Sequence, residues 1–227
     1  MTKTIVVAGF GPGIATSVAE KFGAEGFAVA LVARSAERLA EGARALAAKG
    51  IKAAAFPADL SVPNGIEPLI SKIRGELGPI AVLHWNAYSN AAGDVLAADA
   101  TALQATLDVA VGSLLAAVRA ALPDLRAEKG AVLSTNGGLL FDDPAIDERS
   151  VSWNLMGLSL GNAAKHKLLG LLSQKLKPEG VYVGEVIVTG TIKGSAFDKG
   201  NANLEGAAVA EKFWDLYRAR SQTSVKI

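Results

Sequence analysis

Residues 4–15 read Thr-Ile-Val-Val-Ala-Gly-Phe-Gly-Pro-Gly-Ile-Ala, and this stretch decides the fold. Thr4–Ala8 is an apolar, β-branched run that predicts a buried strand. The loop Gly9–Ala15 follows it and opens directly onto a helix predicted over residues 14–25. Glycines at such a turn let the backbone approach a pyrophosphate, whose charge is met by the helix N-terminus. The loop therefore predicts nucleotide binding, and the alternative is a tight turn that uses glycine for steric reasons alone.

The alternation of apolar runs and helical stretches continues along the chain. Further strands are predicted at residues 28–33, 52–56, 80–84, 131–134 and 181–188, with a short edge strand from 225. Helices are predicted between them, at about 35–50, 61–78, 103–122, 152–177 and 205–220. Six or seven strands alternating with helices predict one α/β domain with a doubly wound parallel sheet (Rossmann-type) and helices on both faces. In such a sheet the ligand crevice lies at the carboxyl ends of the strands.

Composition narrows the class of protein further. The 227 residues include no cysteine and only two histidines, which excludes a disulfide scaffold and a cysteine nucleophile and leaves no metal site to expect. The 23 basic and 22 acidic residues nearly balance, so no nucleic-acid partner is expected. The uncharged stretches at 4–19 and 77–93 are broken by glycine and proline. We therefore expect no membrane partner and a cytoplasmic location.

Several motifs together resemble the short-chain dehydrogenase/reductase superfamily, from the first predicted strand to about Ile192. The loop Gly9–Ala15 fits the family pattern G-x-x-x-G-I-G with Ala15 in place of the last glycine. The other matching motifs are Arg34 after the second strand, Asp59-Leu60 after the third, Asn86-Ala87 after the fourth and Pro178–Val183 before the sixth. The resemblance implies a dinucleotide bound by Gly9, Phe10, Gly11, Gly13, Ile14, Arg34, Ser35, Asp59, Leu60, Asn86, Ala87, Thr135, Gly190 and Ile192.

The end of the second strand distinguishes NADP(H) from NAD(H). A carboxylate there bonds the ribose hydroxyls of NAD and repels a 2′-phosphate. This chain instead has Arg34 and Ser35, with no acid before Glu37. An arginine grips a phosphate through a bidentate, charge-assisted contact. We therefore expect NADP(H), and the alternative is that Arg34 is a solvated charge at the sheet edge.

Two polar residues at the ends of the next strands have a cofactor role and a structural alternative. By resemblance, Asp59 contacts the adenine amino group and Asn86 lines the nicotinamide ribose. From the residues alone, Asp59 is equally a helix-capping acid ahead of Ser61, and Asn86 is equally a turn former.

The catalytic residues of the family are absent from their counted positions. In the family a tyrosine donates the proton, a lysine four residues later lowers its pKa, a serine orients the carbonyl and an asparagine holds a water. Counting back from Gly180 places the lysine position at Asn162 and the tyrosine position at Leu158. The serine position after the fifth strand is Gly137, and the asparagine position within residues 108–111 is Ala110. No tyrosine occurs between Tyr88 and Tyr182, so a small shift of alignment does not restore the set.

Three residues are weak candidates for the missing chemistry. Lys165 lies three residues after Asn162, although its neighbours His166 and Lys167 favour a solvated charge. Ser134 ends the fifth strand beside the cleft, where it contacts a substrate, contacts the cofactor or caps the loop. Tyr88 is the one phenol near the expected crevice, and packing beside Trp85 is the simpler interpretation. His84 is expected to be a satisfied core histidine.

The segment from Gly190 to Gly206 is polar and glycine-rich, and by resemblance it is a substrate lid. The leucine-rich helices at 103–122 and 158–176 are first of all core faces, and the resemblance implies that they pair in a homo-oligomer, a dimer or a tetramer. The leading hypothesis is an NADP(H)-dependent oxidoreductase acting on a small carbonyl or alcohol substrate with a non-standard proton donor. The alternatives are a catalytically silent NADP(H)-binding regulatory or structural partner protein and, third, a non-redox enzyme that reuses the crevice.

Overall fold

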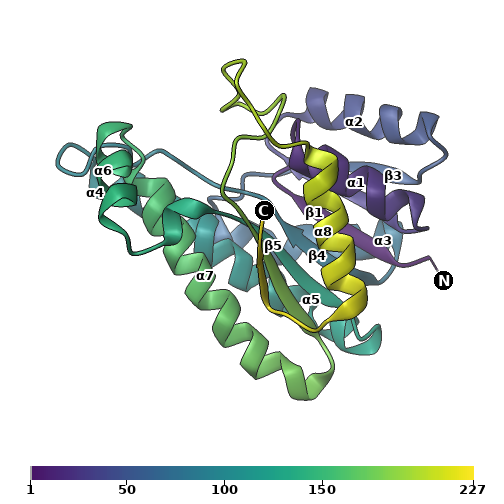
Figure 1. Cartoon of the computed structure of the whole chain (residues 1–227). Coiled ribbons are helices and arrows are strands. Elements are labelled where there is room, and N and C mark those ends of the chain that lie inside the picture. Colours follow the sequence, from purple (N-terminus) through teal and green to yellow (C-terminus); the bar gives the residue numbers. More distant parts are fainter. Residues whose placement is uncertain (1) are drawn as a thin grey trace.

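Seven parallel strands form one sheet, in the order β3-β2-β1-β4-β5-β6-β7 (Figure 1). The structure is a computed structural model that describes residues 2–227. The strands are β1 (Thr4–Ala8), β2 (Ala28–Ala33), β3 (Ala53–Pro57), β4 (Ile80–Trp85), β5 (Ala131–Gly137), β6 (Tyr182–Val188) and β7 (Ser224–Lys226). Strands β1 to β3 are added towards one edge of the sheet and β4 to β7 towards the other. The order therefore reverses between β1 and β4, where doubly wound sheets have the crevice that binds ligands.

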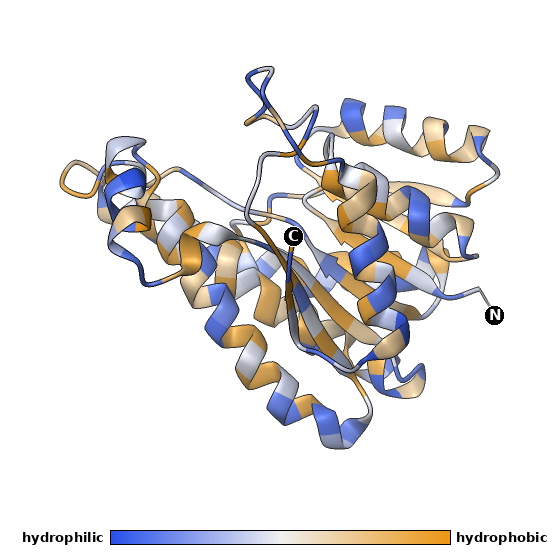
Figure 2. Ribbon diagram, viewed as in Figure 1, coloured by the Kyte–Doolittle hydropathy of each residue, from blue (hydrophilic) through white to orange (hydrophobic). Residues whose placement is uncertain are grey.

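Helices cover both faces of this sheet. They are α1 (Ile14–Ala24), α2 (Ala36–Ala48), α3 (Ile66–Leu77), α4 (Ala100–Leu107), α5 (Ser113–Ala127), α6 (Pro144–Ser152), α7 (Met156–Leu176) and α8 (Gly206–Ala219). One hydrophobic core joins the sheet to α3, α5 and α7, and a second joins the opposite face to α1, α2 and α8. The strands are accordingly coloured mostly as hydrophobic in Figure 2, because parallel strands covered on both faces have few solvent-facing positions. The doubly wound fold predicted from the sequence is confirmed.

The structure differs from the prediction mainly between β5 and β6. One helix was expected over residues 152–177, but α6 forms first and the chain turns at 153–155 before α7 begins. Asp143 caps α6 by accepting a hydrogen bond from the N–H of Ala145. The sequence pattern did not predict this helix, which begins at Pro144 after the Asp143 cap, because α6 is short and mostly polar. The predicted edge strand is present as β7 and pairs with β6.

The helical run 100–127 comprises α4, a π-helical turn at Asp108–Gly112 and α5. Its length and mean hydropathy would suffice to cross a membrane. In this structure the run packs against α3, β4 and α7, so its apolar face belongs to the protein core. The π-helical turn brings Ala110 to the end of the sheet where the candidate site lies.

Candidate functional site

The glycine loop after β1 is shaped by close backbone contacts. A side chain at Gly9 would place its Cβ 2.5 Å from the backbone nitrogen of Ala87, and Gly9 has a φ of 85°. Gly13 is the residue before α1 and has a φ of 88°, a conformation that favours glycine. Within residues 2–227 no side chain caps α1, and its first turn has no acidic residue. The N–H groups that no side chain caps, and the open space at Gly11, therefore suit a diphosphate.

The residues after β2 and β3 form the side of the crevice expected to hold the adenosine end of the cofactor. Ser35 caps α2, and its hydroxyl accepts a hydrogen bond from the N–H of Arg38 at 3.2 Å. Asp59 accepts hydrogen bonds from the N–H and hydroxyl of Ser61, which lower the pKa of the carboxyl, and the charge of Arg34 adds to this effect. Asp59 thus caps a turn instead of a helix, since α3 begins only at Ile66. It remains a fixed, charged acceptor close to Arg34.

A groove beside the glycine loop was not predicted. It has a volume of about 310 Å³ and lies between α1 and α2. Residues of the glycine loop and α1 line one side of it, and α2 lines the other with Arg38, Glu41, Gly42, Ala45 and Leu46, so the groove holds one basic residue and two acidic ones, Glu20 and Glu41. Arg38 lies in the first turn of α2, after the Ser35 cap, and no short sequence pattern indicated this groove because it forms between two helices that are separate in the chain.

The remaining predicted cofactor residues have structural contacts of their own. Asn86 donates a hydrogen bond from its side-chain nitrogen to the backbone oxygen of Gly9 at 3.2 Å, so it fixes the glycine loop. Leu60 and Ile14 pack with the two hydrophobic cores. The methyl Cγ2 of Ile192 lies 3.1 Å from the position that a Cβ on Gly13 would occupy. Gly190 cannot carry a side chain, because a Cβ there would lie 2.6 Å from the Oδ1 of Asn203.

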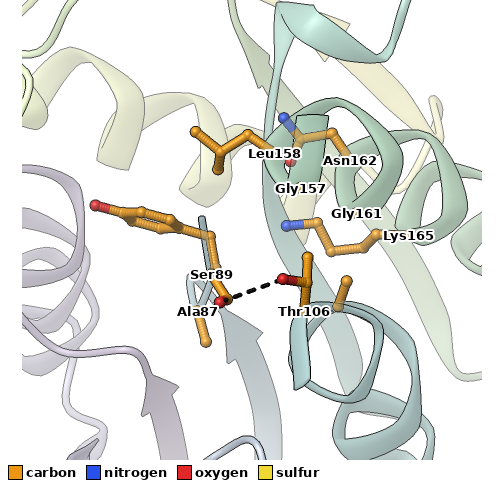
Figure 3. Close-up of a pocket in the computed structure, with 10 residues that line it drawn as sticks. Ala87, Ser89, Thr106, Gly157, Leu158, Gly161, Asn162 and Lys165 are labelled. Atoms are coloured by element: carbon orange, nitrogen blue, oxygen red, sulfur yellow. Dashed lines mark hydrogen bonds between the residues drawn. The ribbon is translucent and has the colours of Figure 1, made fainter. Parts of the chain in front are cut away.

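A small pocket lies at the carboxyl ends of β4 and β5, against α7 (Figure 3). It is lined by Ala87, Tyr88, Ser89, Thr106, Ala110, Gly157, Leu158, Gly161, Asn162 and Lys165. Its enclosed part measures about 10 Å³, close to the room that one water molecule needs. The walls are mainly apolar, and the polar side chains among the lining residues are those of Tyr88, Ser89, Thr106, Asn162 and Lys165. A pocket of this kind suits a small polar group positioned by a few defined contacts.

Lys165 is the charged residue of this pocket, which corrects the expectation of a solvated charge. The residue is only 3% exposed, and its amino group points into the pocket (Figure 3). The amino group donates a hydrogen bond to the backbone oxygen of Thr135 at 2.8 Å. Burial lowers the pKa of Lys165 to about 8, and the charge of Glu185 opposes part of that shift. At neutral pH the group therefore stays mostly protonated, yet its proton is more acidic than that of an exposed lysine.

The four positions counted from the family pattern converge on this pocket. Ala110, Leu158 and Asn162 line it, and a Cβ on Gly137 would lie 2.8 Å from the side-chain nitrogen of Asn162. Apart from the amide of Asn162, these side chains offer no polar group. The lysine that the pocket does contain, Lys165, enters from the next turn of α7. Sequence counting thus located the pocket, and Lys165 was among its candidates, but the sequence favoured a solvated charge where the structure buries it.

Two other candidates lie differently from the prediction. Ser134 is fully buried, and its hydroxyl donates to the backbone oxygen of Trp85, so it does not reach the pocket. Tyr88 does line the pocket, and its ring packs against Phe197 with the centroids 5.7 Å apart instead of against Trp85. Burial raises the pKa of Tyr88, so this phenol is a weaker acid than free tyrosine.

His84 is a core residue, as expected, but only one of its ring nitrogens has a partner among residues 2–227. Its Nε2 contacts the hydroxyl of Thr135 at 3.2 Å, and its Nδ1 is buried without a hydrogen bond. Burial and the charge of Lys165 lower the pKa of His84 to about 3, so the ring is neutral beside the charged lysine. Thr135 therefore uses its backbone oxygen for Lys165 and its hydroxyl for His84.

The lid segment, Gly190–Gly206, begins directly after β6 and lies over the crevice. A short bridge between Ile192 and Leu204 closes its base. Its tip is bounded by Gly194 and Gly200, which both have positive φ angles, and carries Phe197 toward Tyr88. The rings of Tyr88 and Phe197 are each about half exposed and join the lid segment to the pocket wall.

The sequence model of the family described as short chain dehydrogenase matches residues 3–139, which is more than half of the chain. The chain belongs to the short-chain dehydrogenase family. The matched residues include the glycine loop, Arg34, Asp59 and Asn86, and they end just beyond β5.

Individual short-chain dehydrogenases resemble the chain at low identity. The meso-2,3-butanediol dehydrogenase of Serratia marcescens is 30% identical over 133 residues, which are 59% of this chain and 52% of that protein. The chain thus matches about half the length of this relative. An uncharacterized oxidoreductase of Staphylococcus saprophyticus is 26% identical over 81% of this chain and 76% of its own. A short chain dehydrogenase from Burkholderia cenocepacia, solved in complex with NADP, is 23% identical, with a TM-score of 0.85 over 99% of this chain and 96% of its own.

Proposed function

We propose that this short-chain dehydrogenase is an NADP(H)-dependent oxidoreductase that acts on a small carbonyl or alcohol substrate, with Lys165 as its proton donor. The observation that carries the proposal is the buried amino group of Lys165, which points into the pocket lined by three of the four expected catalytic positions, Ala110, Leu158 and Asn162. A lysine with a pKa of about 8 is both largely protonated and acidic enough to give up its proton near neutral pH.

The cofactor preference follows from the adenosine side of the crevice. Arg34 stands where a carboxylate would select NAD, and Arg38 lines the groove beside the glycine loop. The uncapped start of α1 supplies the N–H groups for the diphosphate. The complex of the Burkholderia cenocepacia structure with NADP supports the same choice. When bound, NADPH supplies the hydride for carbonyl reduction.

The residues of the chain then hold and protonate the substrate oxygen. Lys165 stabilises the negative charge that develops on this oxygen and donates its proton to it, which leaves a neutral amine and an alcohol. The backbone oxygen of Thr135 keeps the amino group at one place in the pocket. Tyr88 lines the pocket, and its ring packs against Phe197 of the lid segment. The neutral amine regains its proton from solvent when the lid segment opens.

The proposal is tested in two stages with purified protein. Titration with NADPH and with NADH, followed by nicotinamide fluorescence, measures the cofactor preference. A panel of small aldehydes, ketones and hydroxyketones then measures protein-dependent loss of NADPH. We expect tight NADPH binding and turnover that Lys165→Met removes, while the exposed control Lys167→Met remains active.

Each negative result has a definite meaning. NADPH binding without turnover on any member of the panel supports the silent binding protein instead, an outcome consistent with the absent phenol and hydroxyl at Leu158 and Gly137. Failure to bind either nucleotide would overturn both functions. Full activity in Lys165→Met would remove Lys165 as the proton donor and leave the oxidoreductase class intact.

A further inference from the structure

A second buried charge lies behind Lys165, on the central part of β6. Glu185 is 2% exposed and is the one acidic residue within the seven strands of the described chain. Burying a carboxylate in a sheet costs several kcal/mol unless the charge is paired and hydrogen-bonded. Its neighbours on the strand, Val183, Val186 and Ile187, are buried and apolar. The charge itself therefore calls for an explanation.

Both oxygens of the Glu185 carboxylate are fixed. Oε2 accepts a hydrogen bond of 3.0 Å from the side-chain nitrogen of Asn136, which also donates to the backbone oxygen of Asn162 at 3.1 Å. Oε1 is hydrogen-bonded to Nδ1 of His166, whose ring is half exposed at the surface of α7. The carboxylate is thus clamped between β5 and α7, the two elements that also hold Lys165.

Lys165 and Glu185 approach the same short piece of β5 by different routes. Lys165 binds the backbone oxygen of Thr135, and Glu185 binds the side chain of the next residue, Asn136. On α7, Lys165 is adjacent to His166, the other partner of Glu185. Opposite charges that are both removed from water interact more strongly than charges at a surface, and the charge of Glu185 raises the pKa of Lys165.

Resting on the proposed function, we propose that Glu185 is a positioning residue for Lys165, whose buried counter-charge keeps the amino group protonated between turnovers. His166 and Asn136 hold the carboxylate in place for this role. Besides His166, which is bonded to Glu185, the titratable groups near Lys165 in the described chain include His84 from β4 and Tyr88 from the loop after β4. The ring of His84 and the phenol of Tyr88 are both neutral at pH 7, so neither replaces the negative charge of Glu185.

The test measures the titration of Lys165 directly, in protein without nucleotide or substrate. Lysine side chains labelled with ¹³C and ¹⁵N are followed by NMR from pH 6 to 11, and the Lys165 signal is assigned by its loss in Lys165→Met. In Glu185→Gln, which keeps the shape and removes the charge, we expect the Lys165 midpoint to fall by about one pH unit, a tenfold loss of proton affinity. Lys167→Gln, an exposed change on the same helix, should leave the midpoint unchanged.

A purely structural Glu185 predicts a different pattern. Glu185→Gln would then lower the thermal unfolding temperature and leave the Lys165 midpoint where it is, which would overturn the proposal. If Glu185→Gln does not fold, Glu185→Met supplies the same measurement, because well-packed apolar replacements of buried charges are often tolerated.

The two proposals also fail separately. A shifted midpoint in a protein that never oxidises NADPH would support the Glu185–Lys165 pair and reject the oxidoreductase. In an active protein, the basic limb of the pH profile should move down together with the NMR midpoint. Turnover with an unshifted midpoint in Glu185→Gln would reject the role of Glu185 alone.

Discussion

Lys165 and Thr135, thirty residues apart in the sequence, are joined by a 2.8 Å hydrogen bond from the lysine amino group to the threonine backbone oxygen. This contact fixes the one cation of the pocket to the end of a central strand instead of to a mobile side chain. Because a backbone oxygen cannot be removed by substitution, the position of the amino group is set by the fold. A substitution at position 165 therefore changes the chemistry of this side chain and leaves the backbone oxygen of Thr135 in place.

The first prediction concerns Lys165 as proton donor. Replacing it by Met should lower kcat for carbonyl reduction by roughly 100-fold or more, since positioned acid catalysis contributes about that much. The dissociation constant for NADPH should stay within about twofold, because the amino group of Lys165 is held by the backbone oxygen of Thr135 and contacts neither Arg34 nor the glycine loop. Stopped-flow turnover and fluorescence titration measure the two quantities. Equal losses in kcat and in NADPH affinity would instead indicate a damaged fold.

The second prediction concerns Arg34. Arg34→Ala should weaken NADPH binding by about 10- to 100-fold, as expected for the loss of a charge-assisted contact with a 2′-phosphate. NADH binding should hardly change, since it lacks that phosphate. Arg44→Ala, an exposed arginine on α2, serves as the control for net charge. Parallel weakening of both nucleotides by Arg34→Ala would speak against a phosphate contact.

The third prediction concerns stability in acid. His84 has a pKa of about 3 in the folded protein, below the usual 6.5, so between these values the unfolded chain binds a proton that the native protein does not. The neutral His84 ring therefore makes its full contribution to the free energy of unfolding above about pH 6.5, and this contribution is lost progressively as the pH falls. At pH 5 the loss is about 2 kcal/mol. Urea unfolding of His84→Gln, which does not titrate, should show a flatter decline from pH 7 to 5, and an equally steep decline would contradict it.

The fourth prediction concerns the aromatic contact between Tyr88 and Phe197. Phe197→Ala should raise KM for the carbonyl substrate by about two- to tenfold, the range expected for loss of one aromatic pair, because the lid segment then closes less often. Tyr88→Phe keeps both rings and should leave KM nearly unchanged. Steady-state kinetics at saturating NADPH tests both variants. An unchanged KM in Phe197→Ala would mean that the pair does not take part in closure.

Local sequence signals were sufficient for the strands and for the cofactor side of the site. The strand at Thr4–Ala8, the glycine loop and the Ser35 cap depend on residues close together in the chain, so short patterns predicted them. The pocket was also located, because helical and strand positions can be counted from Gly180. The sequence did not reveal the burial of Lys165, since its neighbours His166 and Lys167 are hydrophilic.

The contacts that were missed all depend on segments far apart in the chain. Phe197 reaches Tyr88 only because the lid segment crosses the crevice, and Glu185 meets His166 only because α7 packs on β6. An isolated glutamate in an apolar run was visible in the sequence, and it was the one available signal for a buried polar cluster.

The lid segment has a consequence for how fast a nucleotide enters. Ile192 and Ser195 lie within van der Waals distance of the space beside Gly13, so the glycine loop is roofed in the free protein. A dinucleotide arriving from solvent has to wait for that roof to lift, and its association rate then levels off at high concentration instead of rising without limit. Release of the bound dinucleotide is slowed by the same opening of the lid segment. The slowest event in each cycle is thus expected to be the departure of the spent coenzyme, whatever substrate the pocket accepts.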